Sequence, residues 1–228
     1  MLVIGHRGSA GTKPENSIAG LREAIAVGAD MIEFDVRITK DKRVVLAHDW
    51  HMFRHHRKLD YIRRHTLTEL KKRTAGSEYP VVTIEQVLKE CYGKILLNIE
   101  LKERSVVAPL LVALEPYLQE EEDWDNVLFS AFNPLILRML RKRSPHAALA
   151  MLHYRNPLNF MAWHRILNLS AVGFHRLYIT SLSLEVAKRL ELFTYAYTIN
   201  RADAAQKLAS KGIDGIVTDF PGKFVEKL

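Results

Sequence analysis

Two acidic residues, Glu33 and Asp35, stand one residue apart in an otherwise apolar run at positions 31–36. Side chains alternate across a β-strand, so both carboxylates point to one face while the intervening apolar residues point to the other. Apolar flanks of this kind are typical of a strand buried in a parallel sheet. Two buried carboxylates repel each other, and a divalent cation between them relieves that repulsion. The alternative, a solvent-facing strand with two surface acids, is disfavoured by the apolar flanks.

Other chemically active side chains stand at the ends of further apolar runs; they are His6, Arg7, His48, Glu100 and Lys102. Three carboxylates form an all-oxygen site, which suits a hard cation such as Mg²⁺ or Ca²⁺ and does not select zinc. Arginine and lysine bind phosphate oxygens, and histidine serves as a general acid or base near neutral pH. Each group alone is a weak signal, but together they suit the cleavage of a phosphate ester.

Nine strand-like runs alternate along the chain with segments that are mostly helical. Such alternation predicts a parallel sheet with helices outside, and eight strand–helix units close a barrel. The surplus run, 44–48, follows the strand at 31–36 without a helix between them, so the two runs form a hairpin. The expected pairing sets Asp35 opposite His48. The sequence therefore predicts an α/β fold, a TIM-type (β/α)8 barrel with a β-hairpin extension of its second strand.

Local signals predict where several helices begin. Thr83 and Gln86 form a capping box, Pro134 stands at a first helical position after Asn133, and Ser183 is expected to cap a later helix. Active sites of such barrels lie where the strands end and the loops to the helices begin. The candidate residues above all stand at such ends.

Size, apolar content and cysteine usage limit the class of protein. A chain of 228 residues, 48% apolar, matches the length of one α/β barrel, and we expect a single catalytic domain over 1–228. No run of about 20 apolar residues and no signal-peptide pattern stand out. Cys91 is the single cysteine, which excludes an internal disulfide and suits a reducing compartment. These features predict a cytoplasmic protein.

The net charge of +7 is concentrated in one segment. Positions 50–79 hold eight Lys and Arg against three Asp and Glu, a local net charge of +5. We expect 50–80 to form a small inserted subdomain, and a solvated lid with scattered charge is the favoured interpretation. Transient contact with a membrane surface is the disfavoured alternative. No nucleic-acid partner is expected, and the oligomeric state is not predicted.

A series of short motifs runs through the chain between residues 5 and 221. They are His6-Arg7-Gly8, Pro14-Glu15-Asn16, Glu33-x-Asp35-Val36, Thr39-x-Asp41, Val45-x-x-His48-Asp49, Asn98-x-Glu100-x-Lys102 and Asp214-Gly-Ile-Val-Thr-Asp-Phe-Pro221. Their order and spacing resemble the glycerophosphodiester phosphodiesterase family of the phospholipase C-like phosphodiesterase superfamily. The resemblance implies a β/α barrel that hydrolyses small glycerophosphodiesters to sn-glycerol 3-phosphate and an alcohol, in lipid and glycerol metabolism.

The same resemblance implies roles for the acids and the histidines. Glu33, Asp35 and Glu100 are expected to bind one divalent cation, Mg²⁺ or Ca²⁺. His6 and His48 are expected to form the catalytic acid–base pair. Which histidine is the acid stays open, and so does the choice between water and the glycerol 2-hydroxyl as the attacking group.

The resemblance also assigns the phosphate-binding groups and one departure from the family pattern. Arg7 and Lys102 are expected to hold the phosphate. Tyr197 stands where the family usually has tryptophan, and it is expected to form an apolar wall against the glycerol. The preferred head-group alcohol is not predicted.

Two other functions stay open. A lysophospholipase D-type phosphodiesterase on the same barrel would be favoured by an apolar groove near the insertion. A non-catalytic protein that binds anions or nucleic acid through the basic segment would show salt-dependent binding without turnover. The intact set of acids, cations and histidines argues against the second function.

Overall fold

The computed structural model describes residues 1–56, 60–153, 156 and 158–225. Within these ranges eight parallel strands close into a barrel, because β1 pairs with both β2 and β9. The barrel strands are β1 (Leu2–His6), β2 (Met31–Ile38), β4 (Leu96–Leu101), β5 (Val127–Ala131), β6 (Ala148–His153), β7 (Ala171–His175), β8 (Phe193–Tyr197) and β9 (Gly215–Thr218). The predicted TIM-type barrel is confirmed.

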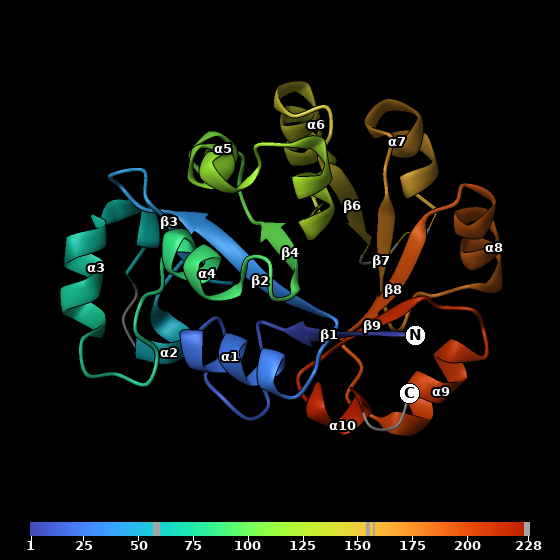
Figure 1. Cartoon of the computed structure of the whole chain (residues 1–228), viewed down its shortest axis with the longest axis horizontal. Helices are drawn as coiled ribbons and strands as arrows, with labels where there is room; N and C mark the ends of the chain where they lie inside the picture. Colours follow the sequence, from blue (N-terminus) through green and yellow to red (C-terminus); the bar gives the residue numbers. More distant parts are fainter. Residues whose placement is uncertain (57–59, 154–155, 157, 226–228) are drawn as a thin grey trace.

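Helices between successive strands form a ring around the barrel (Figure 1). The ring helices are α1 (Ile18–Ala26), α4 (Ile84–Cys91), α5 (Val107–Leu114), α6 (Pro134–Arg143), α7 (Phe160–Leu167), α8 (Ser181–Arg189) and α9 (Ala202–Ala209), followed by α10 (Gly222–Val225). Short 3₁₀ turns are η2 (Arg104–Val106), η3 (Glu115–Tyr117) and η4 (Glu121–Asn126). Among the described residues no helix has both the length and the apolar character needed to cross a bilayer.

The helix starts follow local capping chemistry. Thr83 and Gln86 form the predicted capping box, and Pro134 is the first residue of α6. The prediction that Ser183 caps α8 is wrong. Thr180 is the cap, and Ser183 is its capping-box partner three residues later. Both residues have hydroxyl groups, so the sequence alone did not fix which one began the helix.

The core has two layers because strand side chains alternate. On β2, Ile32, Phe34 and Val36 face outward and pack in the large cluster between barrel and helices. The opposite face of the strand turns inward, where Met31 packs among apolar side chains such as Ile4 and Val217. Glu33 and Asp35, farther along the same face, therefore project into the barrel beyond this inner apolar cluster.

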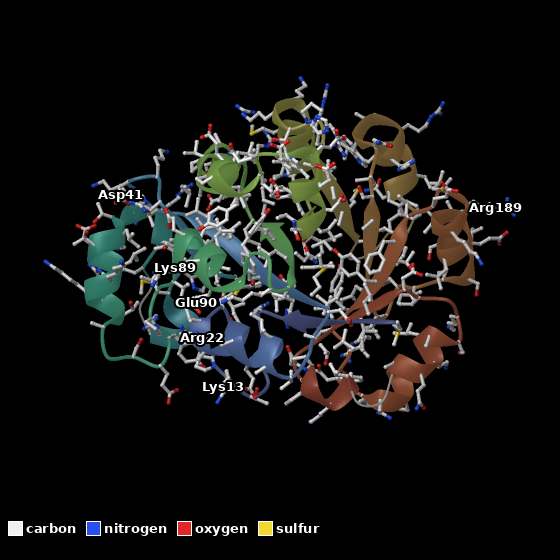
Figure 2. The ribbon with its side chains drawn as sticks, viewed as in Figure 1. Lys13, Arg22, Asp41, Lys89, Glu90 and Arg189 are labelled. Carbon is white, nitrogen blue, oxygen red and sulfur yellow. The ribbon has the colours of Figure 1, made fainter. Side chains whose placement is uncertain are left out.

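An exposed ion pair also joins two ring helices. Arg22 on α1 donates to both carboxylate oxygens of Glu90 on α4, at 2.9 and 2.7 Å. The two side chains lie side by side at the periphery (Figure 2), where solvent and salt weaken such pairs. The buried contact between the helices, through residues such as Leu21 and Leu88, is therefore the main force holding them together.

The hairpin is present, but its register differs from the prediction by one residue. β3 (Val44–Leu46) runs antiparallel to β2, and Val36 pairs with Leu46. The predicted pairing of Asp35 with His48 is therefore wrong, and Asp35 accepts a hydrogen bond from the backbone of Ala47 instead. The reason lies in the turn, where Lys42 adopts a positive φ of 61° and Thr39 bonds to the carbonyl of Arg43.

The inserted segment lies to one side of the ring, next to α1 (Figure 1). Its elements are α2 (Phe53–His56), η1 (Ile62–Arg64) and α3 (Leu67–Thr74). Met52, Ile62 and Leu70 pack on Val45 of the hairpin and form a small core of their own. Positions 57–59, which carry part of the basic charge, lie outside the described residues. The division into one catalytic domain with 50–80 as an inserted subdomain stays a prediction.

Candidate active site

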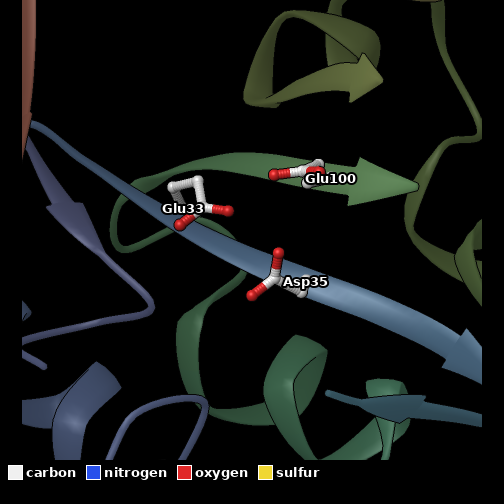
Figure 3. A group of neighbouring side chains, drawn as sticks. All are labelled: Glu33, Asp35 and Glu100. Carbon is white, nitrogen blue, oxygen red and sulfur yellow. The ribbon is translucent and has the colours of Figure 1, made fainter. Parts of the chain in front are cut away.

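Three carboxylates from neighbouring strands meet inside the barrel. β2 carries Glu33 and Asp35, and β4 carries Glu100, which pairs in register with Asp35. One oxygen from each side chain lies within 4.8 Å of the others, and all three residues are buried. Figure 3 shows the side chains converging from the two strands. Strand alternation thus places both acids of β2 on the inner face.

The negative charge of Asp35 is balanced by neighbouring cations more fully than the charge of either other acid would be. Its Oδ1 lies 2.8 Å from Nζ of Lys102, and its Oδ2 lies 3.2 Å from Nε of Arg7. The side-chain amide of Asn16 donates to the same Oδ2 at 3.0 Å and accepts from the backbone N–H of Asp35. Burial alone would raise the pKa of Asp35, but the charges of Lys102 and Arg7 hold that pKa well below its ordinary value.

For the other two acids, the ionised form is not fully compensated by neighbouring positive charge. Burial and the nearby Asp35 raise the pKa of Glu100 to about 8, although Lys102 also contacts it. Burial and Asp35 likewise raise the pKa of Glu33, which accepts a hydrogen bond from the backbone N–H of Arg7 at 3.0 Å. The poor compensation of these two carboxylates and the all-oxygen donor set fit a hard divalent cation.

His6 ends β1 and is held by an acid from the adjacent strand end. Its Nδ1 lies 2.6 Å from Oδ1 of Asp219, which directly follows β9. The amide of Asn200 donates to the other oxygen of Asp219 at 2.6 Å. Burial alone would lower the pKa of His6, but the hydrogen bond to Asp219 and the charge of Glu33 raise it. With Nδ1 bonded, Nε2 is the nitrogen that can exchange a proton.

His48 reaches the same place from the end of the hairpin. Its Nδ1 lies 2.8 Å from Oδ1 of Asp49. Burial and the charges of Lys102 and Arg7 lower the pKa of His48, and the opposing effect of Asp35 is smaller. The two histidines therefore have pKa values shifted in opposite directions.

A cavity of about 560 Å³ brings these side chains together; its lining includes His6, Arg7, Glu33, His48, Glu100, Lys102 and Tyr197. The hydroxyl of Tyr197 donates to the backbone carbonyl of His153 at 2.6 Å. Its ring meets the ring of Phe132 edge-on, with centroids 5.9 Å apart. Tyr197 and Phe132 thus form an aromatic wall on one side of the cavity.

A second cavity, of about 650 Å³, lies between the hairpin and the insertion. His48 borders both cavities, so the two meet at this side chain. The lining of the second cavity is partly apolar, and this part comes from Val45, Met52, Ile62 and Leu70. Such an apolar groove beside the insertion is the feature that would favour a longer substrate.

The insertion also reaches the cavity inside the barrel through a chain of polar contacts. Oε2 of Glu15 lies 2.7 Å from Nη1 of Arg7, and Oε1 of Glu15 lies 3.0 Å from Nε2 of His55 on α2. The ring of His55 stacks on Tyr79, with centroids 4.0 Å apart. Because Arg7 also contacts Asp35, the insertion helps to fix the guanidinium beside the carboxylates.

Replacing His55 by phenylalanine tests this chain of contacts. Phenylalanine keeps a ring to stack on Tyr79 but cannot donate to Glu15, so Arg7 loses part of its support. We expect kcat/KM to fall by roughly tenfold, since small displacements of positioning groups are costly. His55→Gln keeps an N–H donor and should retain most of the activity. Steady-state kinetics of both variants measure the two kcat/KM values. Equal decreases in kcat/KM would contradict a role for the hydrogen bond between His55 and Glu15.

Three residues that hold the site together were given no role from the sequence, namely Glu15, Asn16 and Asp219, although Asp219 stands at the end of the last predicted strand. Each stands in one of the sequence motifs, but the motif alone does not identify its partner. For Asp219 a signal was available. Closure of the barrel sets the end of the last strand beside the end of the first, where His6 lies.

Comparison with known proteins places this geometry in a family. The model of the Glycerophosphoryl diester phosphodiesterase family matches residues 6–223. A glycerophosphodiester phosphodiesterase of Caldanaerobacter subterraneus subsp. tengcongensis is 32% identical over 235 residues, covering 96% of this chain and 94% of that protein. Human lysophospholipase D GDPD1 is 50% identical over 46 residues, which are 20% of this chain and 15% of that protein.

A solved structure is also similar over the whole length. It is an Oleispira antarctica phosphodiesterase in complex with the product sn-glycerol-3-phosphate, with a TM-score of 0.88 and 26% identity, covering 99% of this chain and 96% of that chain. With a family match that spans nearly the entire barrel, the chain belongs to the glycerophosphoryl diester phosphodiesterase family, a family of phosphoric diester hydrolases.

Proposed function

We propose that this chain hydrolyses glycerophosphodiesters to sn-glycerol 3-phosphate and an alcohol. The observation that carries the proposal is one cavity at the strand ends of a family barrel. Into it project acids suited to a metal, two cations suited to phosphate, and two histidines with opposite pKa shifts. The family match and a structural neighbour solved with sn-glycerol-3-phosphate support this substrate class.

Glu33, Asp35 and Glu100 would hold one divalent cation, Mg²⁺ or Ca²⁺. Their oxygens are close enough to share one ion, and the raised pKa values of Glu33 and Glu100 mark an unmet need for positive charge. When bound, the cation would supply Lewis-acid polarisation of a phosphoryl oxygen. Because the glutamates must lose their protons to coordinate, metal affinity should increase with pH.

Arg7 and Lys102 bind the phosphate and stabilise the charge that develops on its oxygens. Both side chains are largely buried, line the cavity and are held by ion pairs, so their positions are fixed before the substrate arrives. Fixed donors in a water-poor site stabilise developing charge far better than mobile ones do. The aromatic wall of Tyr197 and Phe132 contacts the glycerol carbons.

His48 acts as the base and His6 as the acid. The lowered pKa keeps His48 neutral, so it can take the proton of the attacking hydroxyl. The raised pKa favours the protonated form of His6, from which Nε2 can give a proton to the departing alcohol as its P–O bond breaks. Water and the glycerol 2-hydroxyl remain alternative attackers, and ³¹P NMR distinguishes them because only the second forms a cyclic phosphate.

Release of sn-glycerol 3-phosphate from glycerophosphocholine and glycerophosphoethanolamine tests the proposal. We expect EDTA to abolish release and either Mg²⁺ or Ca²⁺ to restore it. Release that EDTA does not affect would overturn the metal assignment. Failure with every metal, combined with salt-dependent binding of polyanions, would instead favour the non-catalytic alternative.

A lysophospholipase D-type activity is the second candidate. The apolar cavity on the far side of His48 and the short match to human lysophospholipase D GDPD1 favour it. Lysophosphatidylcholine in the same assay separates the candidates. Faster turnover of this lipid than of glycerophosphocholine would make the lipid the preferred substrate.

A further inference from the structure

Several large apolar side chains are exposed at the same end of the barrel as the catalytic cavity. They follow the ends of β5 and β7, and they are Phe132, Leu135, Leu177, Tyr178 and Leu182. We call these five residues the apolar rim. Leu177 is 72% exposed and Leu182 is 56% exposed, so this apolar surface is open to solvent. Scattered apolar residues are ordinary on a protein surface, but a group at one edge calls for a partner.

The apolar rim is continuous with the catalytic cavity. Phe132 lines the cavity and contacts Tyr197. Tyr197 in turn meets His175, with ring centroids 5.9 Å apart, and His175 meets Tyr178 at 5.5 Å. Leu177 lies next to Tyr178 along the chain, between β7 and α8. A row of aromatic rings therefore leads from the reaction site to the exposed leucines.

Exposed arginines lie near the apolar rim. Arg104 and Arg176 are exposed on the segments that follow β4 and β7, and Arg138 is exposed in the middle of α6, where it lines a shallow hollow with Arg104 and Leu135. None of the three forms an ion pair with another described residue. The nearest acid after β4, Glu103, is engaged by Arg37 and by a backbone N–H. An anionic partner could pair with these three arginines without breaking any ion pair among the described residues.

We propose that the apolar rim is a docking surface for an anionic membrane. Exposed leucine and aromatic side chains beside arginines that form no ion pair within the described part of the chain fit the headgroup–acyl boundary of a bilayer, where apolar burial and charge attraction add together. An exposed apolar face that binds protein would gain nothing from three like charges unless its partner were acidic. Docking in this way turns the mouth of the catalytic cavity toward the lipid surface.

Vesicle flotation with the full-length chain tests the proposal, using phosphatidylcholine vesicles with and without phosphatidylglycerol. The test variant is L177D/L182D. The matched control is V112D/I166D, because Val112 and Ile166 are 68% and 59% exposed but lie in the last turns of α5 and α7, away from the catalytic end. Both variants add the same charge at equally exposed apolar sites, and thermal unfolding checks that each stays folded.

We expect the unmodified chain to float with phosphatidylglycerol vesicles at low salt and to be released by high salt. The rim variant should bind at least about tenfold more weakly, and the control variant should bind within about twofold of the unmodified chain. Absence of flotation at low salt, or equal losses in the two variants, would overturn the proposal. Concentration-dependent dimerisation that only the rim variant abolishes would assign the surface to a second copy instead. Flotation needs no turnover, so the result stands apart from the proposed reaction.

Discussion

Replacing His6 or His48 by alanine should lower kcat by roughly 10²–10⁴-fold, the usual contribution of one proton-transfer group. Both side chains border the cavity and keep partial exposure, 21% and 34%. Neither contributes much to the apolar core, so alanine removes proton transfer with little effect on folding. His146→Ala is the matched control, since His146 is an exposed histidine that pairs with Glu121 on the outer surface. Unchanged turnover in both site variants would overturn the assignment of His6 and His48 as the acid–base pair.

The pH dependence of kcat/KM tests which histidine does what. The proposed mechanism requires neutral His48 and protonated His6, so activity should fall on the acid side as His48 gains a proton and on the alkaline side as His6 loses one. Asp219→Asn replaces the charged acceptor of the His6 hydrogen bond by a neutral amide, and so removes the negative charge that helps to raise the pKa of His6. The alkaline limb should therefore move to lower pH while the acid limb stays in place. A shift of the acid limb instead would reverse the two roles.

The parts of the site that the sequence could predict depend on local geometry. A period of two forces Glu33 and Asp35 to one face of β2, whatever surrounds the strand. Alternation of strands and helices then implies closure, and closure gathers residues from the strand ends, such as Glu100 and His6. These inferences need no knowledge of which side chains finally touch.

The parts that the sequence could not predict depend on register and long-range contact. The hairpin register turns on the positive φ of Lys42, and lysine is not a residue whose type indicates that conformation. The contact of His55 with Glu15 joins residues 40 positions apart and depends on how the insertion folds back. The opposite pKa shifts of His6 and His48 depend on burial and on charges from several strands, which sequence spacing does not give.

Glu100→Gln and Asp35→Asn should have opposite effects on stability but the same effect on catalysis. Without metal, Glu100 carries a burial and repulsion cost that raises its pKa to about 8, so glutamine should stabilise the protein by on the order of 1–3 kcal/mol at neutral pH. Asp35 instead compensates the buried cations Arg7 and Lys102. Asparagine leaves both cations uncompensated, and we expect a loss of about 3–5 kcal/mol.

Urea unfolding in EDTA measures both effects, and its pH dependence checks their origin. The gain from Glu100→Gln should shrink as the pH falls toward the ordinary glutamate value of 4.5, because protonated glutamate and glutamine are then equally neutral. The loss from Asp35→Asn should persist to much lower pH, because the pKa of Asp35 is strongly lowered. Equal pH dependence in the two variants would mean that the acids do not differ as the contacts imply.

Metal addition completes the comparison. If the three acids bind one cation, Mg²⁺ or Ca²⁺ should raise the unfolding temperature of the unmodified chain, since a ligand that binds only the folded state stabilises it. Both variants lack a ligand, so each should lose most of that increase and also lose kcat/KM by on the order of 10³-fold or more. A Glu100→Gln variant that is more stable but inactive would separate two effects of this carboxylate. Ionising Glu100 lowers the stability of the metal-free protein, and the same ionised group would be a ligand for the bound cation.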